Sequence, residues 1–587
     1  MVAMKRRYFF PRGASQDLVV LLHAYTSRPE KLTALRRVVE HEMPDADLLI
    51  PRLPASLTSM AKPAAIVQSV LGQIDQAWQH AGPDQYRRII LVGHSIGGLV
   101  ARKVYICACG ETAGIPFEAV ISASGVRPWA AKVERIILLA GMNRGWSISH
   151  HLAPLNALLW RLGSLWGNLL WLIRQRPPLI FTIRKGAPFI TQLRIHWLHM
   201  RNHAAEKGVG SALTIQLLGS VDDMVSPEDN IDLVSGRDFA YLDVPYSGHA
   251  NVIEMDAPCP LPVAIAGEAI RTIGEARAAV FRAALIKSAQ ALMQDSVVPS
   301  DLLPEAQRRE VSDVVFVIHG IRDVGYWTHK IARRVLTLAK QTPGEKKVMA
   351  TETSSYGYFP MLPFLLPTKR KEKVEWLMDQ YAEALAQYPN AEFSFVGHSN
   401  GTYLLARALE DYPSCRFKHV VFAGSVVRTR YNWKAAIARG QVRKVLNYVA
   451  TADWVVAFFP RAIQMLRWQD LGSAGHDGFD SVVPGTVEQV CFVRGGHGAA
   501  LNEANWDAIA RFVLTGQKVE PPAGIASTRQ SLTVKLPGLV APLLWAGILA
   551  LVAMVYPIIW NLDLAEWQRT LLVAGFTLAI WKVVTVV

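Results

Sequence analysis

Short apolar runs recur along the chain and alternate with longer segments of helical character. DLVVLLHA begins at Asp17, RRIILVGH at Arg87 and VERIILLA at Val133, and similar runs return after residue 310. Unbroken apolar runs of this length are typical of strands covered on both faces, as in parallel sheets. Strands that alternate with helices indicate an α/β architecture. We therefore expect mostly parallel sheets flanked by helices.

The sequence G-H-S-x-G occurs twice, each time between a predicted strand and a predicted helix. The two stretches are RRIILVGHSIGGLVARKV and AEFSFVGHSNGTYLLARAL. In this arrangement a nucleophilic serine sits on a strained turn and its oxygen projects from the sheet edge. The residues two before and two after must be small, because the strand and helix backbones pass close together there. Gly93 and Gly97 meet this condition around Ser95, as Gly397 and Gly401 do around Ser399.

Three further landmarks accompany both copies in the same order along the chain. An opening strand ends in a histidine, at His23 and at His319, and a later strand ends at an acid in the frame small-x-x-Asp-x-x-Val. A last strand ends at another histidine. This order predicts an internal duplication with two Ser-Asp-His triads. The predicted triads are Ser95, Asp222 and His249 in the first copy and Ser399, Asp453 and His497 in the second.

The chemistry explains why these residue types occur together. Serine is a poor nucleophile at neutral pH, so a histidine must take its proton while a buried carboxylate orients the imidazole. The oxyanion that then forms needs N–H donors already in place. The first donors would be the amides just after each serine, and the second would come from the loop after each opening strand. The candidates are Ile96 with Ala24 or Tyr25, and Asn400 with Gly320 or Ile321.

Each assignment has a competing interpretation. Asp223 stands beside the predicted acid of the first copy, and His476, in SAGHDGF, competes for the role of base in the second. The shared frame and the preceding strand favour the residues named above. His94 and His398, just before the serines, are expected to be structural parts of the turn. Either serine could instead be a relic on a fold kept for binding.

The motifs resemble those of a known family. LVGHSIGGLVARK and LLAGMNRGW in the first copy, and VIHGIRD and FVGHSNGT in the second, resemble α/β-hydrolases of the lipase/esterase-like branch that includes PGAP1-like and DUF676 serine esterases. The resemblance covers roughly residues 15–285 and 310–515. It implies two tandem α/β-hydrolase domains and is far less specific for substrate. The first copy has His-Ala where the family usually has His-Gly, and alanine still offers its N–H.

The first copy carries an insertion that the second lacks. Ser95 and its acid lie 127 residues apart, whereas Ser399 and its acid lie 54 apart. The extra residues, about 143–205, would form a lid over the serine. Between Asn143 and Ala205 there is no Asp or Glu, but there are eight Arg or Lys and five of the 17 tryptophans. Basic residues interleaved with Trp and Leu favour a helix in a lipid headgroup layer. The alternative is a lid that packs on its own domain.

The C-terminal region predicts a membrane anchor. Residues 536–560 form a run of 25 without a charge, and about 20 apolar residues span a bilayer core. After a short polar connection, residues 570–587 form a weaker second span, interrupted by Lys582. Together they predict a transmembrane hairpin. Arg529 and Lys535 precede it, so the positive-inside tendency places the large N-terminal part in the cytosol.

Composition narrows the partners. The 587 residues are 51% hydrophobic and carry a formal net charge of +14, which admits nucleic acid or an anionic membrane as partner. We find no nucleic-acid motif and no Cys-His metal spacing, and the basic excess of the insertion favours lipid. Five scattered cysteines argue against a disulfide framework. The N-terminal segment lacks the pattern of a signal peptide, so we expect the chain to start in the cytosol.

The combined prediction is a membrane-anchored serine hydrolase that cleaves carboxylic esters of lipids or other acylated amphiphiles, without a metal or organic cofactor. The alternatives are a thioesterase or acyltransferase with the same triad, or a membrane scaffold whose hydrolase folds only bind. The oligomeric state stays open. The predicted organisation is domain 1 at 1–295, a linker at 296–313, domain 2 at 314–517, a tether at 518–535 and the hairpin at 536–587.

Overall fold

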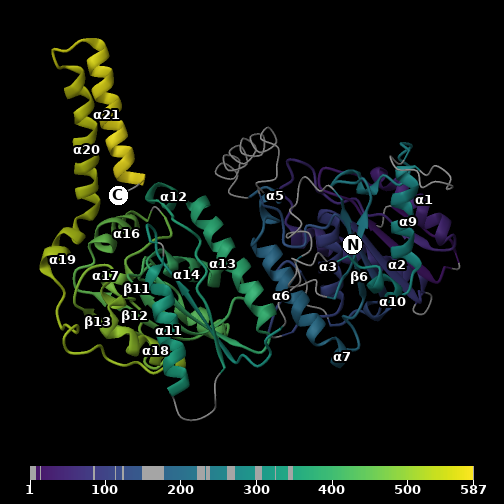
Figure 1. The fold of residues 1–587 in the computed structure, drawn as a ribbon, viewed down its shortest axis with the longest axis horizontal. Coiled ribbons are helices and arrows are strands. Elements are labelled where there is room, and N and C mark those ends of the chain that lie inside the picture. The colour runs from purple at the N-terminus through teal and green to yellow at the C-terminus, as the bar shows by residue number, and fades with distance from the viewer. Residues whose placement is uncertain are drawn as a thin grey trace. The chain divides into compact units, whose positions relative to one another are not determined.

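The chain folds into two compact units, residues Met1–Ala306 (unit 1) and Gln307–Val587 (unit 2) (Figure 1). The finer boundaries given above stay predictions. The computed structural model describes residues 8–13, 15–82, 86–112, 114–121, 125–147, 177–220, 232, 238–260, 272–297, 307–323, 325–341, 348–467 and 469–585.

Unit 1 is built on a seven-stranded sheet of order β1-β3-β2-β4-β5-β6-β7. Neighbouring strands are parallel except for β1 and β3, which run antiparallel at one edge. The strands are β1 (Phe9–Phe10), β2 (Asp17–Leu22), β3 (Asp47–Leu49), β4 (Arg88–His94), β5 (Val133–Leu139), β6 (Leu213–Gly219) and β7 (Ala240–Val244).

Alternate residues of the strands in unit 1 face two different helical layers. Leu18, Val20 and Leu22 pack with α2, α3 and α6, whereas Val19 and Leu21 pack with α1, α9 and α10. Both faces are therefore covered, which is why these strands are apolar throughout. The helices are α1 (Thr33–Glu42), α2 (Pro63–Ala81), α3 (Ile96–Ala108), α5 (Leu179–Thr182), α6 (Pro188–Asn202), α7 (Ala204–Lys207), α9 (Ile273–Ile286) and α10 (Ala289–Gln294).

Unit 2 has a six-stranded, fully parallel sheet of order β13-β12-β11-β10-β8-β9. Helices α11 and α18 pack on one face, and α14 packs against β10 alongside α13. The strands are β8 (Asp313–Ile318), β9 (Met349–Glu352), β10 (Glu392–His398), β11 (Phe417–Ala423), β12 (Val442–Ala450) and β13 (Val487–Val493). The helices before the C-terminal region are α11 (Tyr326–Gln341), α12 (Met361–Leu365), α13 (Pro367–Gln387), α14 (Asn400–Asp411), α15 (Trp433–Ala438), α16 (Trp454–Leu466), α17 (Ala474–Asp477) and α18 (Trp506–Thr515).

The same topology places the serine turn in both units. Each G-H-S-x-G turn follows a central strand, β4 or β10, which lies between the opening strand and the strand that comes next in the chain. This strand order, with a strand–turn–helix at the sheet centre, is that of the α/β-hydrolase fold. The predicted fold class, mostly parallel sheets flanked by helices in two successive units, is confirmed.

The C-terminal region of unit 2 is a pair of long helices that project from the unit as an antiparallel pair (Figure 1). After α19 (Leu532–Leu539) come α20 (Ala541–Trp560) and α21 (Glu566–Thr585), which pack through the rings of Tyr556 and Phe576, 5.4 Å apart. In the part of the chain that the structure describes, α20 is the one helix long and apolar enough to cross a membrane, with a mean hydropathy of 2.2. A transmembrane role for the whole hairpin stays a prediction.

Candidate active site

Ser95 sits on the sharp turn that the sequence predicts. Its backbone has φ 55° and ψ −119°, and its N–H donates to the carbonyl of Leu139 on β5 at 3.0 Å. A side chain on Gly97 would overlap the carbonyl of Leu22, and one on Gly93 would overlap the backbone of Gly97. These contacts are the steric reason for the glycines, because any Cβ there would push the strand and helix apart.

His249 meets Ser95 at the carboxyl edge of the sheet. The Ser95 hydroxyl donates to Nε2 of His249 across 2.9 Å, and both side chains are buried. The two residues are 154 positions apart, and β4 and β7 bring them together because parallel strands end at the same edge. The geometry is that of a nucleophile within reach of its general base.

The histidine before the serine holds the same base from its backbone. Nε2 of His94 donates to the main-chain carbonyl of His249 at 2.8 Å. A carbonyl can only accept, so His94 carries its proton on Nε2. His94 is therefore a structural part of the turn, as predicted, and its contact fixes the segment that carries His249.

The opening loop of unit 1 lies beside the serine and is fixed by His23. Nδ1 of His23 donates to the carbonyl of Ala24 at 2.9 Å, and Nε2 accepts from the N–H of Leu53, also at 2.9 Å. Burial lowers the pKa of His23, which keeps the imidazole neutral in both roles. Ala24 and Tyr25, the predicted second oxyanion donors, line the same cavity as Ser95, and Ile96 begins α3 directly after the serine.

A cavity of about 1120 Å³ opens onto Ser95 and His249. That volume lies just above the range typical of small-molecule sites. Its wall combines apolar side chains with a few charged ones. The described lining includes Tyr25, Leu57, Met142, Trp146, Ile180 and Ile253, together with Arg28, Glu30, Lys31 and Glu254.

The acid predicted for unit 1 lies outside the described residues. Both Asp222 and its competitor Asp223 fall in the segment 221–231, of which nothing is described. The strands nevertheless give the same count in both units. Asp222 is three residues beyond Gly219, the last residue of β6, just as Asp453 is three beyond Ala450, the last of β12. The choice between the two acids stays a prediction.

Unit 2 repeats the turn around Ser399. Its backbone has φ 52° and ψ −119°, and its N–H donates to the carbonyl of Ala423 on β11 at 3.0 Å. A Cβ on Gly401 would come within 2.5 Å of the carbonyl oxygen of Ile318, and one on Gly397 would lie 3.1 Å from the backbone of Gly401. Gly320 approaches from the opening loop, where an added Cβ would lie 2.7 Å from that of Ser399.

The predicted acid and base of unit 2 lie in contact, with Asp453 fully buried and His497 half-buried. Nδ1 of His497 lies 3.0 and 3.1 Å from the two carboxylate oxygens of Asp453, which also accepts from the N–H of Val456 at the start of α16. Burial pushes the pKa of Asp453 upward, but His497 and the N–H of Val456 hold it below the ordinary value. Between the described side chains of Ser399 and His497 there is no hydrogen bond, in contrast to unit 1.

The competitor His476 takes a different partner. Its ring lies 3.0 Å from the side-chain amide of Gln530, and the fully buried acid Asp453 bonds to His497 instead. His398 repeats the role of His94, with Nε2 3.3 Å from the carbonyl of His497. Burial, followed by the nearby His497, lowers the pKa of His398 to about 3, which excludes it as a proton carrier near neutral pH.

Two residues that no motif indicated complete the opening loop of unit 2. Nδ1 of His319 donates to the carbonyl of Gly320 at 2.8 Å, and Nε2 lies 2.7 Å from the hydroxyl of Ser355. The ring of Tyr356 stacks on His319 at 4.4 Å, and its hydroxyl donates to the same carbonyl at 2.7 Å. The side-chain amide of Asn400 donates to this hydroxyl at 3.2 Å. Ser355 and Tyr356 thus hold the loop that carries Gly320 and Ile321.

In the described part of the insertion, helix α6 packs into unit 1. Trp197 on α6 is fully buried, 4.7 Å from the guanidinium of Arg102, and Arg194 forms a buried ion pair of 3.0 Å with Asp232. Trp146 is buried as well and donates to the carbonyl of Ile180. For α6 the headgroup interpretation is therefore wrong, because its apolar and basic residues face the core of unit 1. Trp160, Trp166 and Trp171 lie outside the described residues.

Comparisons with known proteins give distant likenesses only. No protein-family model and no curated protein matches the chain. Among solved structures, phospholipase PlaB from Legionella pneumophila in complex with thio-NAD is 14% identical over 49% of this chain, with a TM-score of 0.29. The chain spans 62% of that structure's length.

Two smaller structures match in the same way. One belongs to work on LipS and LipT, two metagenome-derived lipolytic enzymes, at 13% identity, 42% of this chain, 90% of that one and a TM-score of 0.25. The other is the thioesterase domain from the curacin biosynthetic pathway, at 12% identity, 47% of this chain, 93% of that one and a TM-score of 0.26. Likenesses of this level carry no argument, so the fold assignment rests on the strand order and the serine turns.

Proposed function

We propose that the chain is a membrane-anchored serine hydrolase that cleaves carboxylic esters through an acyl-enzyme. The observation that supports this most directly is the 2.9 Å hydrogen bond from Ser95 to His249, made on a turn with positive φ at the wall of a large cavity. A buried serine needs no such backbone geometry for packing alone. A nucleophile that must project from the sheet edge does.

The proposed reaction in unit 1 begins when Oγ of Ser95 attacks the ester carbonyl and its proton passes to Nε2 of His249. The amide of Ile96, with that of Ala24 or Tyr25, would stabilise the oxyanion. Collapse of this intermediate breaks the bond to the alcohol, which leaves with the proton from His249. Water, deprotonated by the same histidine, then releases the acid and restores Ser95. Asp222 would orient His249 throughout.

Unit 2 offers a second site with the same parts, which we attribute to internal duplication. The Asp453–His497 pair is in place, and Gly320 packs against Ser399. In the proposed reaction Nε2 of His497 would reach the serine when substrate is bound, since catalytic hydrogen bonds often tighten only then. A scaffold role for unit 2 is the alternative, and it predicts that Ser399 does not react.

The anchor would be α20. Only 6% of its most apolar stretch is buried in the structure. The substrates we propose are esters of lipids or other acylated amphiphiles. The cationic residues before the anchor, Arg529 and Lys535, support a cytosolic position for both units. The resemblance of the motifs to those of PGAP1-like serine esterases agrees with this proposal.

A fluorophosphonate probe tests the proposal on the full-length protein in detergent. Peptide mapping should find the probe on Ser95, and Ser95→Ala should remove that label. Hydrolysis of a short p-nitrophenyl ester by unit 1 should fall by ~10⁴–10⁶ in Ser95→Ala. A double variant, Ser95→Ala with Ser399→Ala, that keeps most of the activity would contradict the assignment of both nucleophiles.

A further inference from the structure

Helix α16 of unit 2 turns an unusual face outward. Its exposed and half-buried positions include six large apolar residues and no acid, although a helix at a water-facing surface normally carries polar residues there. Trp454 is 51% exposed and Leu466 is 62% exposed. The six residues are Trp454, Val455, Phe458, Phe459, Met465 and Leu466, called here the α16 face.

The membrane helix starts on this face. The ring of Trp545, in the first turns of α20, stacks on Phe458 at 5.0 Å and lies 5.7 Å from Phe459. The indole N–H of Trp545 donates to the carbonyl of Phe458 at 3.2 Å. The apolar surface of α20 therefore continues directly into the α16 face.

Neighbouring helices extend the same surface. α19, which contacts α16, exposes Leu532, Leu536 and Leu539, and Leu366 is exposed at the end of α12, which contacts α21. Cations stand beside these apolar groups at exposed positions, as at a lipid headgroup layer. They are Lys369, Arg467 and Lys535. Figure 1 shows α12 and α16 at the end of unit 2 from which the two long helices project.

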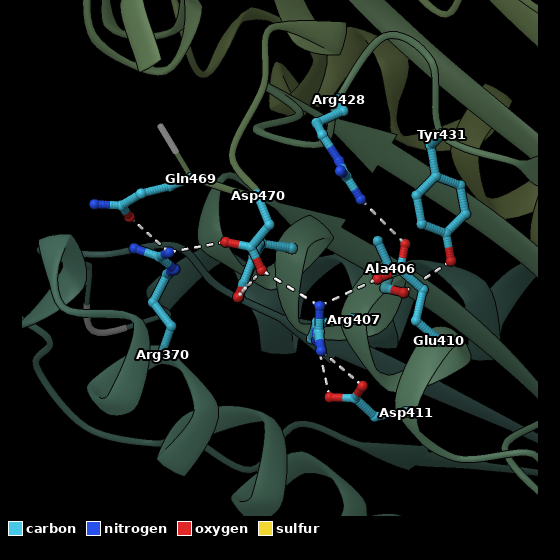
Figure 2. Close-up of polar contacts among 10 residues, drawn as sticks. Arg370, Ala406, Arg407, Glu410, Asp411, Arg428, Tyr431, Gln469 and Asp470 are labelled. Atoms are coloured by element: carbon cyan, nitrogen blue, oxygen red, sulfur yellow. Dashed lines mark hydrogen bonds and ion pairs between the residues drawn. The ribbon is translucent and has the colours of Figure 1, made fainter. Parts of the chain in front are cut away.

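An ion-pair network fixes the C-terminal end of α16 to the body of unit 2 (Figure 2). Asp470, just beyond α16, bonds to Arg370 on α13 at 2.9 Å and to the hydroxyl of Tyr403 on α14 at 2.8 Å. Arg407, also on α14, lies 3.7 Å from the same carboxylate. The fully buried Arg370 also donates to the carbonyl of Phe364 on α12, so α12 and α16 are tied together.

The other end of α16 carries the proposed catalytic acid. Asp453 is the N-cap of the helix, with Oδ1 accepting from Val456 at 3.0 Å, and it is the residue that holds His497. Trp454, the most N-terminal member of the α16 face, is the next residue in the chain. The outward apolar surface and the catalytic pair of unit 2 therefore belong to one rigid element.

From this arrangement we infer that the α16 face lies in the headgroup and acyl boundary of the bilayer, and that the site of Ser399 takes ester lipids directly from that bilayer. The inference rests on the proposed function and gives unit 2, rather than unit 1, the membrane-presented substrates. The sequence instead suggested a lipid surface for the insertion of unit 1, above Ser95. Continuity with α20 is the reason to choose a lipid surface over a protein partner as the occupant.

Photocrosslinking tests the surface without reference to activity. The full-length protein is reconstituted into phosphatidylcholine–phosphatidylglycerol vesicles that contain a phospholipid with a photoreactive group in its acyl chain. Crosslinked peptides should include 454–466 as well as α20. Crosslinks to α20 with none to 454–466 would overturn the inference.

Substitution tests whether the surface serves the site. Met465→Glu with Leu466→Glu places two charges on the α16 face, two turns or more from Asp453. Lipid crosslinking at 454–466 and Ser399-dependent release of fatty acid from vesicles should each fall at least about tenfold, because a charged side chain opposes burial in the apolar layer of a bilayer. Fluorophosphonate labelling of Ser399 in detergent should stay unchanged. The matched control is Val482→Glu, an exposed apolar residue in the turn before β13. It lies before the amino end of that strand, whereas α16 begins beyond the carboxyl end of β12.

The outcomes separate the two levels of the argument. Vesicle hydrolysis that survives the double substitution, while Ser399 is labelled, overturns the inference and leaves the serine hydrolase intact. A Ser399 that never reacts with the probe overturns the proposed function of unit 2, and with it the lipid route to that site, while crosslinking still decides where the α16 face lies.

Discussion

His94 and His249 are joined by a hydrogen bond of 2.8 Å from the imidazole Nε2 of the first to the main-chain carbonyl of the second. The same contact recurs in unit 2 between His398 and His497, at 3.3 Å. The histidine of each G-H-S-x-G turn therefore holds the backbone of the proposed base rather than the serine itself. Its role is to position the base.

Replacement of His94 should lower turnover more than substrate affinity. His94→Phe removes the donor to the carbonyl of His249, so we expect kcat for a short-chain ester to fall roughly 10–100-fold while KM changes little, as for a small misplacement of a catalytic group. His94→Gln, whose amide can still donate, should recover much of the loss. Steady-state kinetics of the two variants in a Ser399→Ala background measures this.

A structural role alone would give a different result. If the histidine only fills space, His94→Phe and His94→Gln should both lower the melting temperature and the yield of folded protein, with an unchanged kcat per labelled serine. Titration of active sites with the fluorophosphonate probe separates the two cases, because it counts competent Ser95 directly.

Gly320→Ala should silence Ser399 without unfolding unit 2. The added methyl group would lie 2.7 Å from Cβ of Ser399, closer than carbon atoms approach without a shift of the loop or the turn. Labelling of Ser399 should therefore slow by at least about tenfold. The matched control is Gly498→Ala, where an added Cβ meets nothing within 4 Å.

Unit 1 tolerates an alanine at the corresponding position. The effect of a methyl group there therefore depends on the backbone of the opening loop and not on the residue type alone. Ala24 occupies the corresponding position after His23 and is accommodated beside Ser95. The Gly320 prediction fails if Gly320→Ala and Gly498→Ala are labelled at the same rate, and the opening loop of unit 2 would then have to be as tolerant as that of unit 1.

Asp222→Asn should abolish most of the activity of unit 1, whereas Asp223→Asn should not. Loss of the carboxylate that orients a catalytic histidine costs ~10⁴ in kcat, because the imidazole takes the wrong tautomer. The frame shared with Asp453 assigns this role to Asp222. Kinetics of each variant in a Ser399→Ala background decides. The reverse order would assign the acid to Asp223, and equal losses would contradict the assignment to Asp222 alone.

The parts of the site that the sequence predicts are those fixed by steric necessity and strand order. A serine on a turn with positive φ requires glycine two positions away, as the contact between Gly97 and Leu22 illustrates. Strands that alternate with helices form parallel sheets whose carboxyl ends meet, so Ser95 and His249 could be placed together in advance. The Asp453–His497 pair follows from the same rule.

In the insertion, ion pairs with residues far away in the sequence could not be predicted. Arg194 and Arg201 stand in a stretch without acids, which favoured a lipid partner. Their carboxylates come from Asp232 and Asp238, more than 30 residues later, and Trp197 packs under Arg102 from α3. A local count of charges registers the cations and cannot register partners that only the fold supplies.

The roles of the loop around Tyr356 and of the α16 face could not be predicted for a related reason. No motif distinguishes Tyr356 from the other aromatic residues of its loop, and its role depends on a stack with His319 that is 37 residues away. The sequence of α16 is equally typical of a helix buried in the core. The exposure of its residues, and the contact of Phe458 with Trp545, appear only once α20 is in place.

The last prediction concerns pH. Burial, with a contribution from His497, lowers the pKa of His398 to about 3 in the folded chain, against about 6.5 when unfolded. Below pH 6.5 the unfolded state binds more protons, so stability falls as the pH drops toward 3, by at most about 1.4 kcal/mol per pH unit. His398→Gln keeps a donor for the carbonyl of His497 but cannot titrate, so the melting temperature of the full-length variant should decline less steeply between pH 6.5 and 4.5.

The pKa of Asp453 is held below its ordinary value, so this acid stays ionised across that window and adds no slope. Other buried histidines, such as His196, contribute equally to both proteins and cancel in the difference. Scanning fluorimetry in detergent measures both slopes, and identical slopes would mean that His398 is protonated as readily in the folded chain as in the unfolded one.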